Sequence, residues 1–339
     1  MTGPTPTSLM RLVTGFWGFK TLAAALELEL FATLAGGRIR SAAELGAELG
    51  LPERATDVLL AACASLGLLE RAGDGYRNTP QAEQFLVPGQ RYYFGDQVRH
   101  ADRRAGAWQR LTEALRTDQP ASWEAGSQDS VFDTDDPQFL GSFWEAMHST
   151  SSFTAARLAE AYDFSPHTRL LDVGGGSGAC AIELCRRYPS LRATIYDLPV
   201  ACRVADEKIA ESGLGGRIDA VRGDFRSDPA LPPGYDAILL SSILHDWDEP
   251  TGRALLRLCH AALPAGGVVV ISELLLNPER TGPADAALMG MNMLVNTEGG
   301  RNYSETEYSQ WLRETGFGEV TVVRFDAPGA NGAVLGVKQ

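Results

Sequence analysis

The sequence lacks the features that direct a chain out of the cell or into a membrane. It has no run of about 18 apolar residues, and its amino terminus has no basic segment followed by an apolar stretch, so neither a membrane span nor secretion is expected. Its 5 cysteines form no C-x-x-C pair and do not have the density of a disulfide framework. The sequence therefore predicts a cytoplasmic protein that does not bind membranes.

Positive charge is also scarce. The 30 Lys and Arg residues are outnumbered by 43 Asp and Glu residues, which gives a formal net charge of −13. Phosphate backbones are bound by clustered Lys and Arg side chains, so nucleic acid is not expected as a partner. With 339 residues, of which 44% are hydrophobic, the chain is long enough for two globular domains.

The feature around which the chain is organised is a glycine-rich turn. Residues 169–178 read Arg-Leu-Leu-Asp-Val-Gly-Gly-Gly-Ser-Gly, and helical spacing of apolar residues follows. This pattern predicts a buried strand that turns sharply into a helix at the end of a parallel sheet, where nucleotide-type ligands bind. Gly174, Gly176 and Gly178 allow the backbone to approach such a ligand closely because they carry no Cβ.

The nature of that ligand depends on Asp172, which precedes the glycines. A carboxylate in this place repels a pyrophosphate but attracts a cation, and S-adenosylmethionine carries a sulfonium, an ammonium and no phosphate. Gly174, Gly176 and Ala179 also satisfy the dinucleotide fingerprint, so a nicotinamide enzyme and a turn without any ligand are the alternatives. The position of Asp172 favours S-adenosylmethionine.

Acidic residues also end the next two predicted strands. The strand after the glycine loop ends at Asp197, with Leu198 beside it, and the following strand ends at Asp224 and Phe225. Asp197 can accept hydrogen bonds from both ribose hydroxyls, and an acid beside an aromatic ring suits adenine. Each residue alone is also typical of a turn. Carboxylates at three successive strand ends indicate a nucleotide-type site.

Residues 1–100 are predicted to be mostly helical. Helical spacing of apolar residues covers three segments, at residues 9–34, 41–51 and 52–69. A β-hairpin pattern follows at residues 66–78. Ser41 and Glu44 make a capping box at the start of the second helix. Together these segments form a winged-helix pattern, which makes a DNA-binding regulator an alternative function.

The candidate recognition helix argues against DNA binding. Between Glu53 and Gly67 its one basic residue is Arg54, whereas a helix in the major groove presents several Arg, Lys, Asn or Gln side chains. The apolar helix faces of residues 1–100 exceed what this small region can bury alone, which suggests a second copy of the chain as partner. We therefore predict a winged-helix dimerisation domain at residues 1–100 and a homodimer.

Residues 101–150 are expected to form a helical linker. Turn-forming residues dominate positions 126–136, and helical spacing resumes at 137–149, where Phe143 and Met147 lie. Aromatic and methionine side chains at such spacing usually belong to a core. Between two domains they also suit the wall of a substrate cleft.

Residues 151–339 alternate strands and helices, which predicts an α/β fold with a doubly wound parallel sheet. Beyond the strands already named, the pattern predicts four more, at residues 235–241, 268–275, 320–325 and 333–337. The connection between the last two is too short for a crossover helix. The final pair is therefore expected to be antiparallel.

The predicted chemistry centres on a histidine in the segment Ile-Leu-His-Asp-Trp at residues 243–247. A lone histidine is more often a capping or core residue. His245, however, follows a strand at the edge of the cofactor crevice, and Glu273 lies at the end of the adjacent strand. There the carboxylate can accept a hydrogen bond from Nδ1 and leave Nε2 free, so these two residues are the predicted catalytic pair.

Six motifs in the sequence resemble those of the S-adenosylmethionine-dependent small-molecule O-methyltransferases, which include plant caffeic-acid-type enzymes and bacterial enzymes of antibiotic biosynthesis. They are the glycine loop, Tyr-Asp-Leu-Pro at 196–199, Gly-Asp-Phe at 223–225, Leu-His-Asp-Trp at 244–247, Ile-Ser-Glu at 271–273 and Gly-Gly-Arg at 299–301. The resemblance covers almost the whole chain and extends to the winged-helix segment.

The resemblance implies a Rossmann-like class I methyltransferase sheet of seven strands, the last one antiparallel, in residues 151–339. It also implies that His245 is a general base supported by Glu273. It also implies a set of cofactor-binding residues, of which the first is the acid of the glycine loop: Asp172, Gly174, Gly176, Gly178, Asp197, Leu198, Asp224, Phe225 and Ser241.

Two positions depart from the family pattern. Asn302, the third candidate catalytic residue, stands where the family often has a second acidic residue. An Asn can orient an imidazole but cannot stabilise an imidazolium as a carboxylate does. Ser241 stands where plant members tend to have Lys. Because relatives with altered catalytic sets methylate carbon, C-methylation of an activated aromatic ring or of an amino-acid-derived substrate is the alternative reaction. Metal-using relatives add His ligands near residues 290–300, which contain no His here, so no metal is expected.

The predicted substrate is a small aromatic precursor of a secondary metabolite, and the predicted methyl acceptor is its phenolic hydroxyl. A phenol with a pKa of about 10 is only about 0.1% ionised at pH 7, and an imidazole with a pKa of about 6.5 can take its proton. The candidate pocket wall consists of Phe143, Met147, Met289, Met293 and Asn296.

Overall fold

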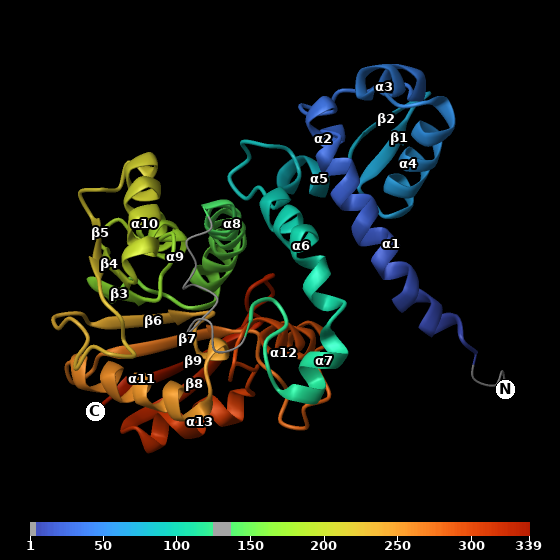
Figure 1. The fold of residues 1–339 in the computed structure, drawn as a ribbon. Coiled ribbons are helices and arrows are strands. Elements are labelled where there is room, and N and C mark those ends of the chain that lie inside the picture. The colour runs from blue at the N-terminus through green and yellow to red at the C-terminus, as the bar shows by residue number, and fades with distance from the viewer. Residues whose placement is uncertain (1–4, 125–136) are drawn as a thin grey trace. The chain divides into compact units, whose positions relative to one another are not determined.

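The computed structural model describes residues 5–124 and 137–339, the side chains of 137–139 excepted. The chain divides into two compact units, residues 1–103 and 104–339 (Figure 1). The turn-rich segment predicted at 126–136 lies outside the described residues. None of the described helices combines the length and the apolar character that a bilayer crossing requires.

The first unit consists of short helices and a β-hairpin. Its elements are α1 (Thr7–Glu27), α2 (Leu30–Thr33), α3 (Ala42–Leu49), α4 (Glu53–Ser65), β1 (Leu69–Ala72), β2 (Gly75–Asn78), α5 (Pro80–Phe85) and most of α6 (Gly95–Trp108). The two strands pair antiparallel, which confirms the predicted hairpin.

Local sequence signals explain where these helices begin and end. The helix predicted at 9–34 is interrupted because Glu29 takes a left-handed conformation, with φ 59°, which a right-handed helix cannot contain. The predicted capping box at the start of α3 is confirmed, since the Ser41 hydroxyl accepts from the Glu44 amide at 3.3 Å and the Ser41 amide donates to the Glu44 carboxylate at 2.7 Å.

The apolar residues of this unit fall into a buried and an exposed set. Leu26, Phe31 and Leu60 belong to its core. In the amino-terminal half of α1, Leu12 and Phe16 keep 78% and 60% of their side-chain surface exposed. The single chain therefore leaves an apolar face of α1 uncovered.

The second unit is built on a sheet of 7 strands in the order β5-β4-β3-β6-β7-β9-β8. The strands are β3 (Arg169–Val173), β4 (Arg192–Asp197), β5 (Ile218–Arg222), β6 (Ala237–Ser241), β7 (Val268–Glu273), β8 (Phe317–Arg324) and β9 (Gly332–Lys338). Neighbours from β5 to β7 run parallel, and β9 runs antiparallel to β7 and β8. The predicted α/β sheet with an antiparallel last strand is confirmed.

Helices cover both faces of this sheet, and each face has its own core (Figure 1). Adjacent residues of β3 point to opposite faces, so Leu170 packs with Leu158 of α8, while Leu171 packs with Leu255 of α11. The helical elements are α7 (Leu111–Thr117), α8 (Pro137–Ala161), α9 (Ala179–Arg187), α10 (Pro199–Ser212), the 3-10 turn η1 (Leu244–Asp246), α11 (Glu249–Ala262), α12 (Ala284–Asn296) and α13 (Glu305–Glu314).

Two helices differ from the predicted pattern. The helix expected at 137–149 continues to Ala161, so it runs through the domain boundary expected after residue 150. α12 has no counterpart among the predicted elements, although Met289, Met293 and Asn296 follow the helical spacing of four and three residues.

The strand order creates a crevice at one edge of the sheet. From β3 the chain passes to β4 on one side, whereas β6 lies on the other side of β3. At such a reversal the connections leave neighbouring carboxyl ends toward opposite faces, and ligands bind between them. In this sheet those two ends are Val173, which precedes the glycine loop, and Ser241, which precedes η1.

Candidate active site

The glycine loop after β3 needs glycine for both its conformation and its packing. Gly174 has φ 69°, and a Cβ there would lie 2.5 Å from Cδ1 of Ile243 in the turn after β6. Gly176 has φ 56°, and a Cβ there would lie 2.9 Å from the ring of Trp144 on α8. Gly178, with φ 78°, precedes α9. The loop is thus packed between α8 and the turn after β6, and its glycines leave the backbone uncovered by side chains at these positions.

Asp172, directly before the end of β3, is a buried carboxylate with one unsatisfied oxygen. The residue is 1% exposed, and its Oδ2 has no hydrogen-bond partner among the described residues. Burial, reinforced by the charge of Asp197, raises the pKa of Asp172 to about 7. A buried carboxylate is stabilised by a nearby cation or donor, so this residue fits a positively charged ligand such as S-adenosylmethionine.

Asp197 at the end of β4 is fixed by backbone amides. Its two oxygens accept from the amides of Gly176 at 2.7 Å and Leu198 at 2.6 Å. Burial raises the pKa of Asp197 to about 6. Each oxygen keeps a lone pair, so the carboxylate can still accept hydrogen bonds from two ribose hydroxyls.

Asp224, which lies beyond the end of β5, already has a hydrogen-bond partner that the sequence did not indicate. Its two oxygens accept from Nε and Nη2 of Arg226, at 3.0 and 2.9 Å. Burial favours a higher pKa, but these hydrogen bonds hold the pKa of Asp224 below its ordinary value. Phe225 meets Trp247 edge to face, with 5.7 Å between ring centroids. An adenine amino group at this place would therefore share the carboxylate with Arg226.

Ser241 ends β6, the strand beside β3 and its glycine loop. The next residue, Ser242, has φ 57°. A non-glycine residue in this region costs energy and persists only where its surroundings enforce it. The turn that leads to His245 is thus a constrained one.

His245 and Glu273 form the pair that the sequence predicts. His245 lies in η1 and is 7% exposed, and its Nδ1 lies 2.6 Å from Oε2 of Glu273, the last residue of β7. The other oxygen of Glu273 accepts from the amides of Ile243 and Leu244, each at 3.0 Å. The carboxylate is thereby locked, and it holds the imidazole with Nδ1–H donating and Nε2 on the opposite side.

Asp246 is a further site residue, and it is not among the candidates expected from the sequence. Its Oδ1 lies 3.6 Å from Nε2 of His245, so the imidazole stands between two carboxylates. Burial lowers the pKa of His245, but the charges of Glu273 and Asp246 outweigh it and raise the pKa to about 9. Burial raises the pKa of Asp246 to about 6. The signal available in the sequence is its place next to His245.

Asn302 is buried near this pair but does not orient the imidazole. Its Nδ2 donates to the Leu274 carbonyl at 2.7 Å. Its Oδ1 has no hydrogen-bond partner, and no hydrogen bond joins it to His245, among the residues that the structure describes. The catalytic role expected for Asn302 therefore stays a prediction, and the described arrangement gives it no direct contact with the imidazole through a hydrogen bond.

The five residues predicted to wall the substrate pocket lie on two helices. Met289, Met293 and Asn296 are on α12, which packs against η1 and α7 and so lies beside the His245 turn. Asn296 is already engaged, since its Oδ1 accepts from Arg104 Nη2 at 2.5 Å and its Nδ2 donates to the Asn292 carbonyl at 2.8 Å. The other two are on α8, which packs against α9. A pocket shared by all five remains a prediction.

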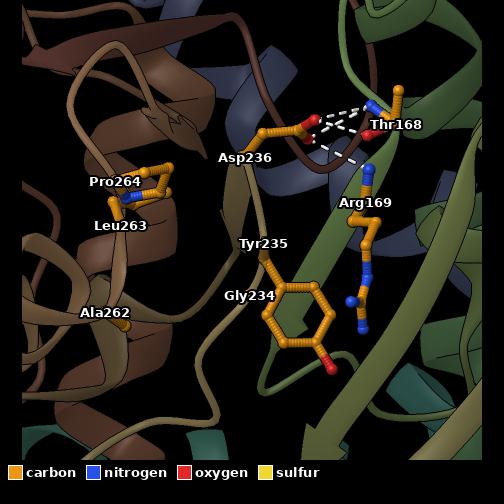
Figure 2. A pocket seen from close by; sticks show the side chains of 8 residues that line it. All are labelled: Thr168, Arg169, Gly234, Tyr235, Asp236, Ala262, Leu263 and Pro264. Carbon is orange, nitrogen blue, oxygen red and sulfur yellow. Dashed lines mark hydrogen bonds between the residues drawn. The ribbon is translucent and has the colours of Figure 1, made fainter.

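A separate hollow of about 380 Å³ lies at the opposite end of the sheet (Figure 2). It is lined by Thr168, Arg169, Gly234, Tyr235, Asp236, Ala262, Leu263 and Pro264. These residues surround the starts of β3 and β6, where Asp236 accepts from the amides of Thr168 at 2.9 Å and Arg169 at 3.0 Å. The hollow is therefore distinct from the crevice at the carboxyl ends.

The fold and the site together define a class of protein. A glycine loop at the switch point, an unsatisfied buried acid before it and a carboxylate fixed at the next strand end suit S-adenosylmethionine. The histidine and glutamate pair beside them suits proton removal from an acceptor. Among the described residues, no group of three or more His, Cys, Asp or Glu side chains is placed to hold a metal ion. The class is a cofactor-dependent methyltransferase.

Comparison with known proteins identifies the family. Residues 10–88 match the O-methyltransferase dimerisation domain, and residues 108–318 match the O-methyltransferase domain. The chain therefore belongs to the S-adenosylmethionine-dependent O-methyltransferases. The family, the fold, the enzyme class and the cofactor expected from the sequence are confirmed, and the first segment is a dimerisation domain rather than the DNA-binding module of a regulator.

Three relatives illustrate the similarity. The chain is 50% identical over 335 residues, 98% of its length and 95% of the relative, to 3-hydroxy-5-methyl-1-naphthoate 3-O-methyltransferase of Streptomyces sahachiroi. It is 33% identical, over 95% of its length and 94% of the relative, to the tetracenomycin polyketide synthesis 8-O-methyl transferase of Streptomyces glaucescens. The solved structure of human N-acetylserotonin methyltransferase in complex with SAM superposes with a TM-score of 0.85, at 27% identity and 99% coverage of both chains.

Proposed function

We propose that the protein transfers a methyl group from S-adenosylmethionine to a hydroxyl of a small hydroxylated aromatic compound, with His245 as general base. The observation that carries the proposal is the position of the His245 imidazole. It follows β6, the strand beside β3 and its glycine loop, and its Nδ1 lies 2.6 Å from Oε2 of Glu273. This arrangement leaves Nε2 as the atom that receives the hydroxyl proton.

The chain's own residues have two tasks in this reaction. When bound, S-adenosylmethionine supplies an activated methyl group. The glycine loop, Asp172 and Asp197 hold that group's position, so the protein aligns acceptor oxygen, methyl and sulfur. His245 removes the acceptor proton as the new carbon–oxygen bond forms, and Glu273 stabilises the imidazolium that results.

The charge balance around His245 sets a condition for this role. With a pKa of about 9, the imidazole carries a proton at neutral pH in the described arrangement. A general base must be neutral at Nε2. The proposed role therefore requires that His245 has lost this proton before it deprotonates the acceptor.

The proposed substrate is a fused-ring or single-ring phenol. The relative with 50% identity is named for a hydroxynaphthoate, and the relative with 33% identity for a polyketide step. Phe143, Met147, Met289, Met293 and Asn296 are proposed as the wall that contacts the ring, since aromatic and methionine side chains pack well on flat apolar surfaces. Asn302 is proposed to contribute to the same site through its free Oδ1.

We further propose that the enzyme is a homodimer in the cytoplasm. The match to a dimerisation domain and the uncovered face of α1, where Leu12 and Phe16 are more than half exposed, support a second copy as partner. All 5 cysteines are buried free thiols, which suits a reducing compartment. Residues 101–150 are proposed to link the dimerisation domain, 1–100, to the catalytic domain, 151–339.

A product analysis tests the proposed reaction. Purified protein is incubated with S-adenosylmethionine and a panel of mono- and dihydroxylated naphthoates and simple phenols, and mass spectrometry detects methyl transfer. Two-dimensional NMR then shows whether the methyl carbon is bonded to oxygen or to a ring carbon. A ring-methylated product would replace the O-methyl assignment with the C-methyl alternative, and light scattering of the same sample gives the oligomeric state.

A further inference from the structure

The amino-terminal edge of the sheet carries a row of three arginines. Arg169 is the first residue of β3, Arg192 is the first residue of β4, and Arg217 directly precedes β5. These three strands are neighbours. Arg169 is paired with Arg192, and the pairing of Ala193 with Ile218 brings Arg217 into the same row. Residues of one row leave a parallel sheet on the same face, so the three side chains begin side by side.

This row of like charges is expected to destabilise the folded protein when no ligand is bound. Like charges opposite each other on adjacent strands destabilise a sheet. Among the described residues, none of these three arginines takes part in an ion pair, whereas Arg186 on α9 and Arg222 at the carboxyl end of β5 pair with Glu183 at 2.9 Å and Asp206 at 3.8 Å. In a chain with 43 acidic and 30 basic residues, a row of three arginines without an ion pair among the described residues is not a consequence of composition.

The three guanidiniums are oriented by neutral groups. Arg192 Nη2 donates to the Gly216 carbonyl at 2.8 Å, and Arg217 Nη1 donates to three carbonyls of the loop before β4, at 3.0 to 3.2 Å. The Arg169 guanidinium lies over the ring of Tyr235, 5.0 Å from its centroid (Figure 2). A guanidinium has five N–H donors, so each arginine keeps donors for a ligand and is already held in place.

All three arginines line one groove of about 470 Å³. The same groove is lined by Gly215 and Gly216, which bring no side chain into it. Asp219 is the one acidic residue in its lining, and its carboxylate accepts from the Thr194 hydroxyl at 2.6 Å. The three positive charges therefore outnumber the single negative charge.

We propose that this groove binds an anion that carries two or more phosphate groups. Strands of a sheet are about 4.8 Å apart, so the row extends over about 10 Å, which suits a chain of phosphates better than a single one. Guanidinium groups bind phosphate oxygens through paired hydrogen bonds. S-adenosylmethionine has no phosphate, and the groove is at the end of the sheet opposite the crevice. The proposal is therefore independent of the methylated substrate.

Calorimetry with sodium tripolyphosphate tests the proposal on the full chain at constant ionic strength. We expect saturable binding at one site per chain. Replacement of the central arginine, Arg192→Gln, is expected to weaken it about tenfold or more, because hydrogen bonds between charged groups are lost. The matched control is Arg203→Gln on the exposed side of α10, which removes the same charge elsewhere. Absence of saturable binding, or an equal loss in the control, contradicts the proposal.

Two further measurements complete the test. ATP binding compared with tripolyphosphate binding separates a nucleotide from a bare phosphate chain, and either result supports the site. Without ligand, Arg192→Gln is expected to melt at the same temperature as the unchanged protein or higher, because repulsion within the row is reduced. Tripolyphosphate should raise the melting temperature of the unchanged protein and of Arg203→Gln, and should raise that of Arg192→Gln by less. If Arg192→Gln does not fold, Arg169→Gln serves instead, and an unshifted melting temperature of the unchanged protein counts against the site.

Discussion

The two ends of the sheet treat the same residue type in opposite ways. At the carboxyl ends, Asp172 is fully enclosed with one oxygen unpaired, and burial raises its pKa to about 7. At the amino ends, Asp236 is partly buried, yet hydrogen bonds from Thr168 and Arg169 outweigh burial and lower its pKa. A satisfied carboxylate stabilises the fold, whereas an unsatisfied buried one lowers stability and indicates a ligand site.

The pH dependence of stability should differ between these two aspartates. The pKa of Asp172 is raised in the folded state, so the folded protein binds the extra proton, and its stability falls as the pH rises from about 4 to about 7. The pKa of Asp236 is lowered, so its contribution is present above about pH 4 and is lost as the pH falls.

The largest effect is expected for His245→Ala. Turnover should fall about 100-fold to 10,000-fold, because the acceptor loses its general base. Cofactor affinity should remain nearly intact, since the fixed carboxylates Asp172 and Asp197 are unchanged. Raising the pH should partly restore turnover, because a phenol that ionises in solution needs no base. Steady-state kinetics and calorimetry with S-adenosylhomocysteine measure the two quantities.

A matched control for that variant is His260→Gln on α11, where the histidine packs edge to face on Phe317. It should retain full turnover. If His245→Ala kept the turnover of the unchanged enzyme at neutral pH, His245 would be a packing residue, and positioning alone would carry the reaction.

Glu273→Gln should approach the effect of His245→Ala, with a loss of about 100-fold. The carboxylate oxygen Oε1 is fixed by the amides of Ile243 and Leu244. The amide oxygen of Gln must take that place, which turns its NH₂ group toward Nδ1 of the imidazole. Nδ1 then has to accept, so the proton moves to Nε2 and blocks it as a base. Near-normal turnover with an unchanged pH profile would show that the tautomer is set by another group.

The third prediction concerns the charge of Asp172. S-adenosylmethionine is a cation at sulfur and S-adenosylhomocysteine is not. Between pH 6 and pH 8, the affinity for S-adenosylmethionine should rise by up to about tenfold more than that for S-adenosylhomocysteine, because Asp172 loses its proton in this range. Asp172→Asn should remove most of this difference, and the exposed control Asp206→Asn should keep it. Equal pH slopes for both ligands in the unchanged enzyme would exclude Asp172 as the group that senses the sulfonium.

The central strands β3, β4 and β7 could be predicted from the sequence because each is a short, mostly apolar run that ends at or just before glycine or an acid. Asp197, Asp224 and Glu273 follow from that rule without knowledge of the strand order. The order itself could not be predicted, because it depends on packing between segments far apart in the chain. The break at Glu29 escaped prediction for a similar reason, since apolar spacing continues across it.

The hydrogen-bond and charge partners of the site residues were less predictable than the places of these residues at the ends of strands. The pair of His245 and Glu273 follows from adjacent strands, but the approach of Asp246 to Nε2 depends on the tight turn of η1. Arg226 follows Asp224 closely in sequence, and its bidentate contact is a rotamer choice that no pattern encodes. Asn302 likewise donates to a backbone carbonyl that only the folded chain brings near.

The smallest effect on catalysis is expected at the amino ends of the strands, for Asp236→Asn. The carboxylate accepts from the Thr168 amide and hydroxyl and from the Arg169 amide, and so ties the start of β3 to the start of β6. An amide keeps one acceptor oxygen and turns its NH₂ group toward other donors, so the free energy of unfolding should fall by about 1 to 2 kcal/mol. Urea unfolding near pH 7 measures this loss, and Asp206→Asn on the exposed surface of α10 should lose less than about 0.5 kcal/mol. Because Asp236 lies away from the crevice, affinity for S-adenosylhomocysteine should not change. A variant that lost cofactor affinity while keeping its stability would mean that the two ends of the sheet are coupled rather than separate.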